Sequence, residues 1–196
     1  MLALADRIGA RCCVNIAGAP SKEWAGPHPD ALKDETFERI VAYVREIIDE
    51  VKPKRTWYAL ETMPWMLPDS ADNYLRLLKA IDRGHFGVHF DAVNLISSPQ
   101  RYFDTGSVIR EFVEKLGSHI KSCHCKDILL STKLSVHLDE VRAGLGGLDY
   151  RVLLRQLDKL EADTPLMLEH LSTAEQYTQA AKHVRAVADE VGVTFR

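Results

Sequence analysis

The sequence predicts an α/β fold in which one parallel sheet is built from strands that alternate with helices. Short apolar runs typical of buried strands follow one another along the chain, and between them apolar residues recur at three- and four-residue steps. No linker, low-complexity segment or block of charge interrupts this alternation. Because strands that alternate with helices form parallel sheets with right-handed crossovers, we expect one domain over residues 1–196.

The apolar patterns define the elements in order. The first long helix should end before Pro53 and a later one at Gly117, because both residues disfavour continuation of a helix. The segment from Ser172 to Glu175 has the spacing of a capping box and should begin the last helix. Residues 127–148 are expected to form a long loop. The expected strands are 11–17, 56–63, 86–93, 120–126 and 165–171, and the expected helices are 37–51, 74–81, 108–116, 150–160 and 172–191.

The composition limits the class of protein. The chain has 196 residues, of which 46% are hydrophobic and 27% charged, with a formal net charge of −3. This balance is that of an ordinary globular protein, and it argues against nucleic acid as a main partner. No apolar run approaches the roughly 20 residues of a membrane span, and Asp6 and Arg7 interrupt the apolar N-terminus before a signal sequence could form. We therefore expect a cytoplasmic protein with no membrane contact.

Four cysteines are present, as Cys12-Cys13 and as Cys123 and Cys125 on either side of His124. Neither spacing is that of a zinc ribbon or a thioredoxin-type motif. Reduced, buried thiols are the expected state. A zinc knuckle around His124 remains the alternative if the cysteines prove to be metal ligands.

Four ionisable residues lie near the carboxyl ends of successive expected strands, namely Glu61, Asp91, His124 and Glu169. Their spacings are 91 − 61 = 30, 124 − 91 = 33 and 169 − 124 = 45 residues. A βα unit of a (β/α)₈ barrel takes about 30 residues, so each unit would present one such group at the same level. Residues two apart in a strand share a face, which would direct all four groups to one mouth.

Three carboxylates and an imidazole in a small space repel one another unless a proton or a cation bridges them. Their oxygen and nitrogen donors suit one divalent ion, such as Mn²⁺, Mg²⁺, Co²⁺ or Zn²⁺. The alternative is that each acid is a helix cap or a surface residue near a strand end. Four such groups in register favour a metal site.

The four positions resemble the metal-ligand series of the xylose isomerase-like TIM-barrel superfamily. The matching residues are Glu61 in LETMPW, Asp91 in HFDAVN, His124 in CHCKD and Glu169 in LEH. This superfamily includes sugar phosphate isomerases and epimerases, ketose 3-epimerases, inosose dehydratases and endonuclease IV-type enzymes. The resemblance implies that the four residues bind one divalent ion and that Glu61 and Glu169 also transfer protons. The five expected strands match strands four to eight, so the fold would be a partial TIM barrel that lacks the first three βα units.

The resemblance also implies a function in carbohydrate metabolism. An isomerase or epimerase would remove a proton next to the carbonyl of a sugar or sugar phosphate, through a metal-stabilised enediolate. One alternative is an inosose-type dehydratase or an endonuclease IV-like metal hydrolase. Another is a truncated, inactive barrel fragment that folds by association. A partial barrel leaves two sheet edges open, so we expect a homo-oligomer that covers them.

Further residues near the expected mouth are candidates for binding substrate. Lys126 shares the face of His124, and its alternative role is that of a solvated lysine at a strand end. Arg142 lies beside the run Gly144-Leu-Gly-Gly147, which is alternatively a flexible turn. His170 should point away from the mouth. The substrate-binding candidates are Asn15, Trp65, Asn94, Lys126 and Arg142.

Overall fold

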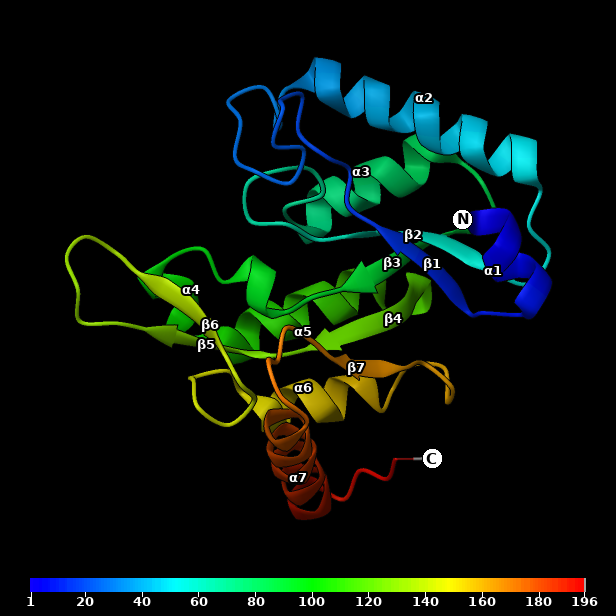
Figure 1. Ribbon diagram of the computed structural model, residues 1–196. Coiled ribbons are helices and arrows are strands. Elements are labelled where there is room, and N and C mark those ends of the chain that lie inside the picture. Colours follow the sequence, from blue (N-terminus) through cyan, green and yellow to red (C-terminus); the bar gives the residue numbers. More distant parts are fainter. Residues whose placement is uncertain (196) are drawn as a thin grey trace. The chain divides into compact units, whose positions relative to one another are not determined.

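The computed structural model describes residues 1–195 and contains a five-stranded sheet and a two-stranded sheet. The strand order of the larger sheet is β1-β2-β3-β4-β7, and its pairs β1–β2, β2–β3 and β4–β7 are parallel (Figure 1). The predicted sheet of five strands that alternate with helices is therefore confirmed. Its strands are β1 (Cys12–Asn15), β2 (Trp57–Glu61), β3 (Phe86–Phe90), β4 (Ile120–Cys125) and β7 (Leu166–Leu168), and the smaller sheet pairs β5 (Asp127–Leu130) with β6 (Leu138–Val141).

All the predicted helices are present. The last of them begins one residue later than its capping box suggests, because Thr173 rather than Ser172 is the N-cap and accepts a hydrogen bond from the backbone N–H of Gln176. The helices are α1 (Leu2–Ile8), α2 (Asp34–Val51), α3 (Ala71–Ile81), α4 (Pro99–Tyr102), α5 (Thr105–Leu116), α6 (Tyr150–Leu157) and α7 (Ala174–Val191), with 3₁₀ turns η1 (Val93–Leu95) and η2 (Gly117–His119).

The chain forms two compact units. The first comprises Met1–Phe90 and His119–Ser122, and the second comprises Asp91–Ser118 and the chain from Cys123 onward. Strand β4 contributes residues to both, so the expectation of a single domain stays a prediction. Among residues 1–195, β1 pairs only with β2 and β7 only with β4. The described helices include none that is both long and apolar enough to span a membrane.

The first unit is organised around a buried tyrosine of α3. Tyr74 is fully buried, and its hydroxyl lies 2.5 Å from the carbonyl oxygen of Leu60 in β2 and 2.9 Å from that of Gly87 in β3. A buried hydroxyl must find partners, so these bonds attach the helix to both strands. Apolar side chains of α2 and α3 complete this core, including Ile40, Val44, Leu77 and Ile81.

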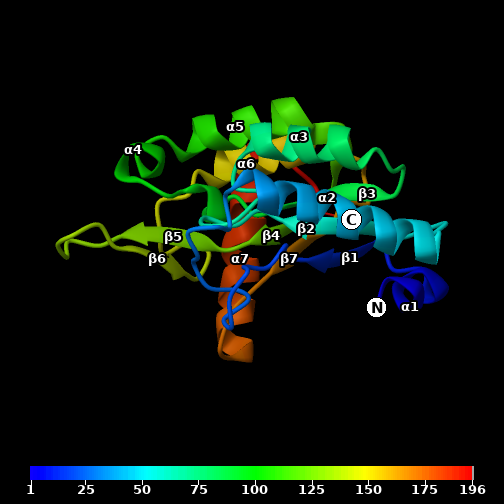
Figure 2. The same cartoon turned by 90° about the horizontal axis from the view of Figure 1, so that it is seen from above.

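The second unit packs α5 and α6 on one face of β4 and β7 (Figure 2). Tyr150 at the start of α6 is buried, and its hydroxyl donates a 2.8 Å hydrogen bond to the carbonyl oxygen of Lys126. His183 of α7 contacts the Tyr150 ring edge-on, with 5.2 Å between ring centroids. These contacts hold the segment that follows β4. The apolar core here includes Ile109, Phe112, Leu116, Leu153 and Val184.

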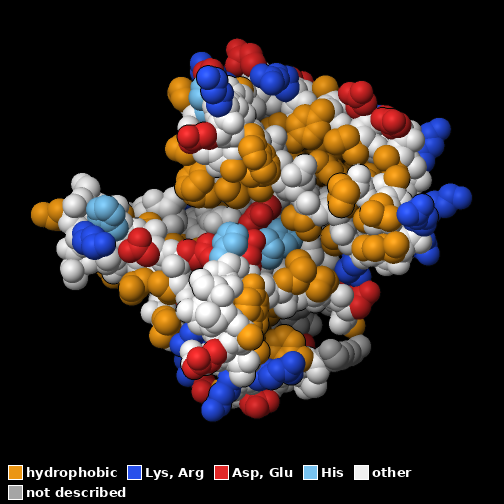
Figure 3. All heavy atoms as spheres, viewed as in Figure 1, with side chains coloured by type: hydrophobic (Ala, Val, Ile, Leu, Met, Phe, Trp, Pro, Cys, Tyr) orange, Lys and Arg blue, Asp and Glu red, His pale blue; other side chains and the backbone are white. Residues whose placement is uncertain are grey.

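The prediction of an irregular loop over residues 127–148 is wrong in its first part. Strands β5 and β6 form an antiparallel hairpin there, in which Asp127 pairs with Val141 and Ile128 with Glu140. The hairpin tip is exposed, with Leu134 98% accessible. Figure 3 shows the hairpin at the left edge, where hydrophobic, basic and histidine side chains cover it. The hairpin matters because it brings Glu140 back toward the end of β4.

Candidate metal centre

Three of the predicted ligands, Asp91, His124 and Glu169, belong to the second unit. Asp91 follows β3, His124 is the penultimate residue of β4, and Glu169 directly follows β7. His124 pairs with Met167 in the parallel register, so Glu169 stands two residues further along. One ligand atom of each residue lies within 4.8 Å of the others. The structure therefore brings together three of the four residues that the strand spacing singled out.

The two oxygens of Asp91 have different roles. Its Oδ1 accepts hydrogen bonds from the backbone N–H groups of Val93, at 2.9 Å, and Asn94, at 3.1 Å. These bonds begin the turn η1. They explain why β3 ends at Phe90, whereas the sequence predicted an end at residue 93. Oδ2 lies 3.5 Å from Nδ1 of His124. The Asp91 side chain is only 1% exposed, so its orientation is fixed by these contacts.

His124 and Lys126 both contact Glu169. Nδ1 of His124 is 3.1 Å from Oε2 of Glu169, and Nζ of Lys126 is 2.7 Å from the same oxygen. The lysine also lies 2.8 Å from Oδ2 of Asp91. Its side chain is 3% exposed, which excludes the interpretation of Lys126 as a solvated strand-end residue. Its role in binding substrate stays a prediction.

The charges of the cluster are mutually stabilised. Burial by itself raises the pKa of Asp91, but the hydrogen bond with His124 and the charge of Lys126 outweigh it and hold this pKa well below its ordinary value. Burial opposes ionisation of Glu169 in the same way, and contacts with His124 and Lys126 lower its pKa to about 2. Burial lowers the pKa of Lys126, but the two carboxylates outweigh it and raise this pKa. At neutral pH the carboxylates are ionised and the lysine is protonated.

Two residues that the sequence did not indicate, Glu140 and His170, also belong to the cluster. Oε2 of Glu140 lies 3.2 Å from Nζ of Lys126, and Oε1 of Glu140 lies 2.9 Å from Nδ1 of His170. Nε2 of His170 is in turn 3.3 Å from Oε1 of Glu169. The expectation that His170 points away is wrong, because its left-handed backbone (φ 54°) turns the chain after β7. No clear sequence signal predicts the hairpin, because its second strand, Leu138–Val141, contains two acidic residues and is separated from the first by residues 131–137.

The donor set fits a divalent cation. The carboxylates of Asp91, Glu140 and Glu169 surround the single ammonium of Lys126, so acidic groups outnumber this cation. Carboxylate oxygens together with an imidazole nitrogen are ligands that Mg²⁺, Mn²⁺, Co²⁺ and Zn²⁺ accept. Asp91, His124 and Glu169 are therefore suited to hold such an ion.

The remaining candidates of the second unit make backbone contacts. Asn94 is half-buried in η1, where its backbone N–H donates to Asp91. Nη1 of Arg142 donates a 3.0 Å hydrogen bond to the carbonyl oxygen of Ala143. The glycine run that follows is held by Asp127, whose carboxylate accepts from the backbone N–H groups of Gly144, Gly146 and Leu148, so it is not a flexible turn. Substrate binding by Asn94 and Arg142 stays a prediction.

Three predicted site residues belong to the first unit. Glu61 is the half-buried last residue of β2. Asn15 is the exposed last residue of β1 and its amide donates to the hydroxyl of Tyr58 at 3.3 Å. Nε1 of Trp65 donates to the carbonyl oxygen of Ala25 at 2.9 Å, which anchors the loop between β1 and α2. The functional roles of these three residues stay predictions.

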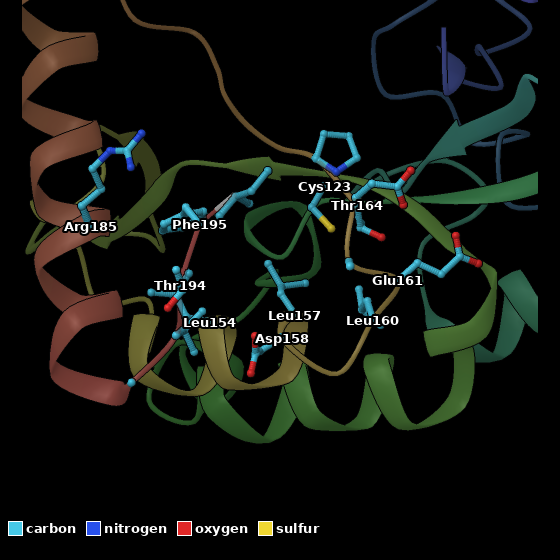
Figure 4. Close-up of a pocket in the computed structure, with 16 residues that line it drawn as sticks. Cys123, Leu154, Leu157, Asp158, Leu160, Glu161, Thr164, Arg185, Thr194 and Phe195 are labelled. Carbon is cyan, nitrogen blue, oxygen red and sulfur yellow. The ribbon is translucent and has the colours of Figure 1, made fainter. Parts of the chain in front are cut away.

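The cysteines beside His124 are buried and reduced, as predicted, whereas Cys12 and Cys13 are free thiols that are only half-buried. Cys125 lies 3.7 Å from the hydroxyl of Tyr150, and burial raises the pKa of its thiol to about 12. Because a thiolate rather than a thiol binds metal, this environment disfavours the zinc-knuckle interpretation. Cys123 lines a cavity of about 940 Å³ together with α6, residues 158–166 and the C-terminal segment (Figure 4). None of the predicted site residues lines this cavity.

The sequence matches the family model of the xylose isomerase-like TIM barrel over residues 1–187. The chain belongs to this family. The family predicted from the sequence is thereby confirmed. This family comprises sugar isomerases and epimerases with related dehydratases. No curated protein sequence matches the chain.

Solved structures of the family superpose on nearly the whole chain. A xylose isomerase domain protein from Planctomyces limnophilus gives a TM-score of 0.71 at 20% identity, covering 97% of this chain and 64% of its own. A xylose isomerase-like TIM barrel protein from Mycobacterium smegmatis, in complex with magnesium, gives a TM-score of 0.71 at 16% identity. The match covers 97% of this chain and 65% of that protein. An L-ribulose 3-epimerase gives a TM-score of 0.66 at 17% identity, and the match covers 97% of this chain and 64% of the epimerase. The chain thus spans just under two thirds of the length of these relatives, and the likeness shows a shared fold.

Proposed function

We propose that the protein is an isomerase or epimerase of a sugar or sugar phosphate that uses one divalent metal ion. Asp91, His124 and Glu169 would hold the ion, with Glu61 as a fourth ligand on the evidence of its strand-end spacing. The observation that carries the proposal is the convergence of two ionised carboxylates and an imidazole within 4.8 Å in a cluster where carboxylates outnumber the ammonium of Lys126. A structural relative determined with magnesium and another described as an L-ribulose 3-epimerase support the ion and the substrate class.

The residues of the chain would divide the chemistry between them. A bound divalent ion supplies Lewis-acid polarisation of substrate oxygens. Glu169 is ionised and would remove the proton from the carbon next to the carbonyl, and Glu61 would return a proton on the opposite face. Lys126 would donate a hydrogen bond to a substrate oxygen. Moving its ammonium away from Glu169 removes a charge that lowers the pKa of this carboxyl, which makes Glu169 a stronger base.

The competing activities share parts of this arrangement. A dehydratase begins with the same proton removal and then expels a hydroxyl group. A phosphodiester hydrolase of the endonuclease IV type would need further histidine ligands and a basic mouth, and the formal net charge of −3 gives no excess of basic residues for a polyanion. The isomerase or epimerase proposal therefore ranks first and the dehydratase second.

Metal content tests the ligands. Purified wild type should carry about one divalent ion per chain by elemental mass spectrometry, and His124→Ala and Glu61→Gln should each lower this content. The matched control is Cys123→Ser/Cys125→Ser, which should keep the ion. Loss of the ion from this control with the acids intact would restore the zinc-knuckle interpretation.

Proton exchange tests the reaction without knowledge of the natural substrate. The metal-loaded chain is incubated in deuterated water with a panel of ketoses and their phosphates, and deuterium next to the carbonyl is followed by nuclear magnetic resonance. Incorporation that depends on Glu169 supports proton transfer. Absence of incorporation with every sugar, from a chain that binds metal, would favour the inactive-fragment alternative.

The sheet edges support a proposal about assembly. Among the described residues β1 and β7 each pair along one edge, and free edges invite pairing with another chain. We propose that a homo-oligomer covers them. Sedimentation equilibrium should give a mass at least twice that of the 22.1 kDa chain. A stable, folded monomer would refute this assembly and leave the metal proposal standing.

A further inference from the structure

The hairpin β5–β6 reaches the metal centre through one side chain, that of Glu140. Its Oε2 lies 3.2 Å from Nζ of Lys126, while Nδ1 of His170 lies 2.9 Å from its Oε1 and 3.1 Å from its Oε2. The side chain is 34% exposed, so it stands at the edge of the buried cluster rather than within it. Glu140 is thus a second acceptor, besides Glu169, that contacts both the lysine and the histidine.

The backbone around Glu140 is held firmly. Asp127 follows Lys126 directly, begins β5 and pairs with Val141. Its carboxylate accepts hydrogen bonds from the backbone N–H groups of Ile128, Gly144, Gly146 and Leu148, which fixes both ends of the hairpin base. Glu140, one residue before Val141, is therefore placed by rigid backbone and not by a mobile loop.

Lys126 occupies the oxygens that a metal ion would need. Its ammonium lies 2.8 Å from Oδ2 of Asp91 and 2.7 Å from Oε2 of Glu169, the oxygens that face His124. A divalent ion bound to these oxygens would repel the ammonium at such short range. The lysine must then find another acceptor, because a buried charge without a partner is costly. Glu140 is the third carboxylate already within reach.

We propose that Glu140 is a positioning residue that receives the ammonium of Lys126 when a divalent ion occupies the oxygens of Asp91 and Glu169. His170 completes the arrangement by contacting both Glu140 and the outer oxygen of Glu169, which leaves Oε2 of Glu169 turned toward His124. The left-handed backbone of His170 accompanies the placement of its imidazole between the carboxylates of Glu140 and Glu169. This inference rests on the proposed metal function.

Titration of metal-stripped full-length protein with Mn²⁺, followed by calorimetry, tests the role of Glu140. Glu140→Ala should weaken Mn²⁺ binding roughly 10- to 100-fold, the range for residues that orient metal ligands. Glu140→Gln keeps an acceptor oxygen and should recover part of the loss. Asp139→Ala is the matched control, because Asp139 is the exposed neighbour on the same strand, and it should change the affinity less than about twofold.

A double-mutant cycle tests the reason for the effect. If Glu140 acts by receiving Lys126, Glu140→Ala should cost less than about threefold in a Lys126→Gln background, because no ammonium remains to be moved. An equal loss in both backgrounds would overturn the proposed role, as would an affinity within twofold of wild type for Glu140→Ala alone. His170→Asn, which tolerates the left-handed backbone, should weaken Mn²⁺ binding in the same direction.

The outcomes separate this inference from the function on which it rests. Wild type that binds no Mn²⁺ would overturn the proposed metal site itself. If wild type binds Mn²⁺ and the Glu140 variants bind it with the same affinity, only the role of Glu140 is overturned. Thermal unfolding of each variant checks that a weaker affinity does not reflect loss of the fold.

Discussion

The two ends of the paired strands β4 and β7 differ sharply in chemistry. At the carboxyl ends stand His124, Lys126 and Glu169, whose charged groups contact one another at 2.7–3.1 Å. The first residue pair of the shared register, Cys123 with Leu166, lines an open cavity of about 940 Å³ instead. The larger space therefore lies away from the convergent ionisable groups. In this protein the contacts between oppositely charged side chains, and not the volume of a cavity, indicate where the candidate site lies.

The physical reason lies in the cost of burial. An ionisable group in a strand remains there only if partners offset its desolvation, so the polar end is densely connected. The pair Cys123 and Leu166 carries no ionisable strand side chain, and open space lies beside it. Changes at the carboxyl end should thus affect chemistry and stability strongly, and changes at the amino end should affect both weakly.

The largest expected effect is the loss of proton transfer on changing the carboxyl end. Glu169→Gln keeps the size of the side chain but removes its basicity, so deuterium incorporation into an accepted sugar should fall roughly 10²- to 10⁴-fold. The far-ultraviolet circular dichroism spectrum should be unchanged. Activity within tenfold of wild type would remove Glu169 from the reaction.

A second effect concerns the stability of the metal-free protein. Lys126→Met removes an ammonium that contacts both the buried carboxylate of Asp91 and the half-buried carboxylate of Glu169. The free energy of unfolding in urea should fall by about 3 kcal/mol. Added Mn²⁺ should recover part of this loss by replacing the missing charge. Unchanged stability without metal would show that the lysine is not needed to balance the cluster.

Acid should weaken the same end of the strands. The pKa of Glu169 is lowered from 4.5 to about 2 in the folded protein, and that of Asp91 is also lowered. The unfolded chain therefore binds more protons below about pH 4.5, and the stabilisation present above that value is lost as the pH falls toward 2. Urea unfolding between pH 2.5 and 6 should show this slope, and Lys126→Met should flatten it.

The smallest effect is expected at the amino end. Cys123→Val replaces a buried thiol that lines the cavity with a side chain of similar size, and the unfolding free energy should change by less than about 1.5 kcal/mol. Metal content should stay equal to that of wild type. A variant that folds but lacks metal would show that the two ends are not independent.

Much of the fold could be predicted because hydrophobic periodicity is a local signal. The alternation of strands and helices and the helix ends near Pro53 and Gly117 follow from neighbouring residues. The exact strand ends did not follow: β3 stops at Phe90 because the carboxylate of Asp91 captures two backbone N–H groups. That bond competes with continuation of the strand, and no apolar pattern records it.

The sequence by itself determined which strand ends carry ionisable residues, since Asp91, His124 and Glu169 recur with the βα repeat and meet where parallel strands end. Only the tertiary structure decided how those charges are balanced. The ammonium of Lys126 reaches Glu169, 43 residues away, and Glu140 enters through a hairpin in a segment expected to be a loop. His170 joins them through a left-handed backbone. Such contacts depend on pairing register and on single backbone angles, which periodicity does not specify.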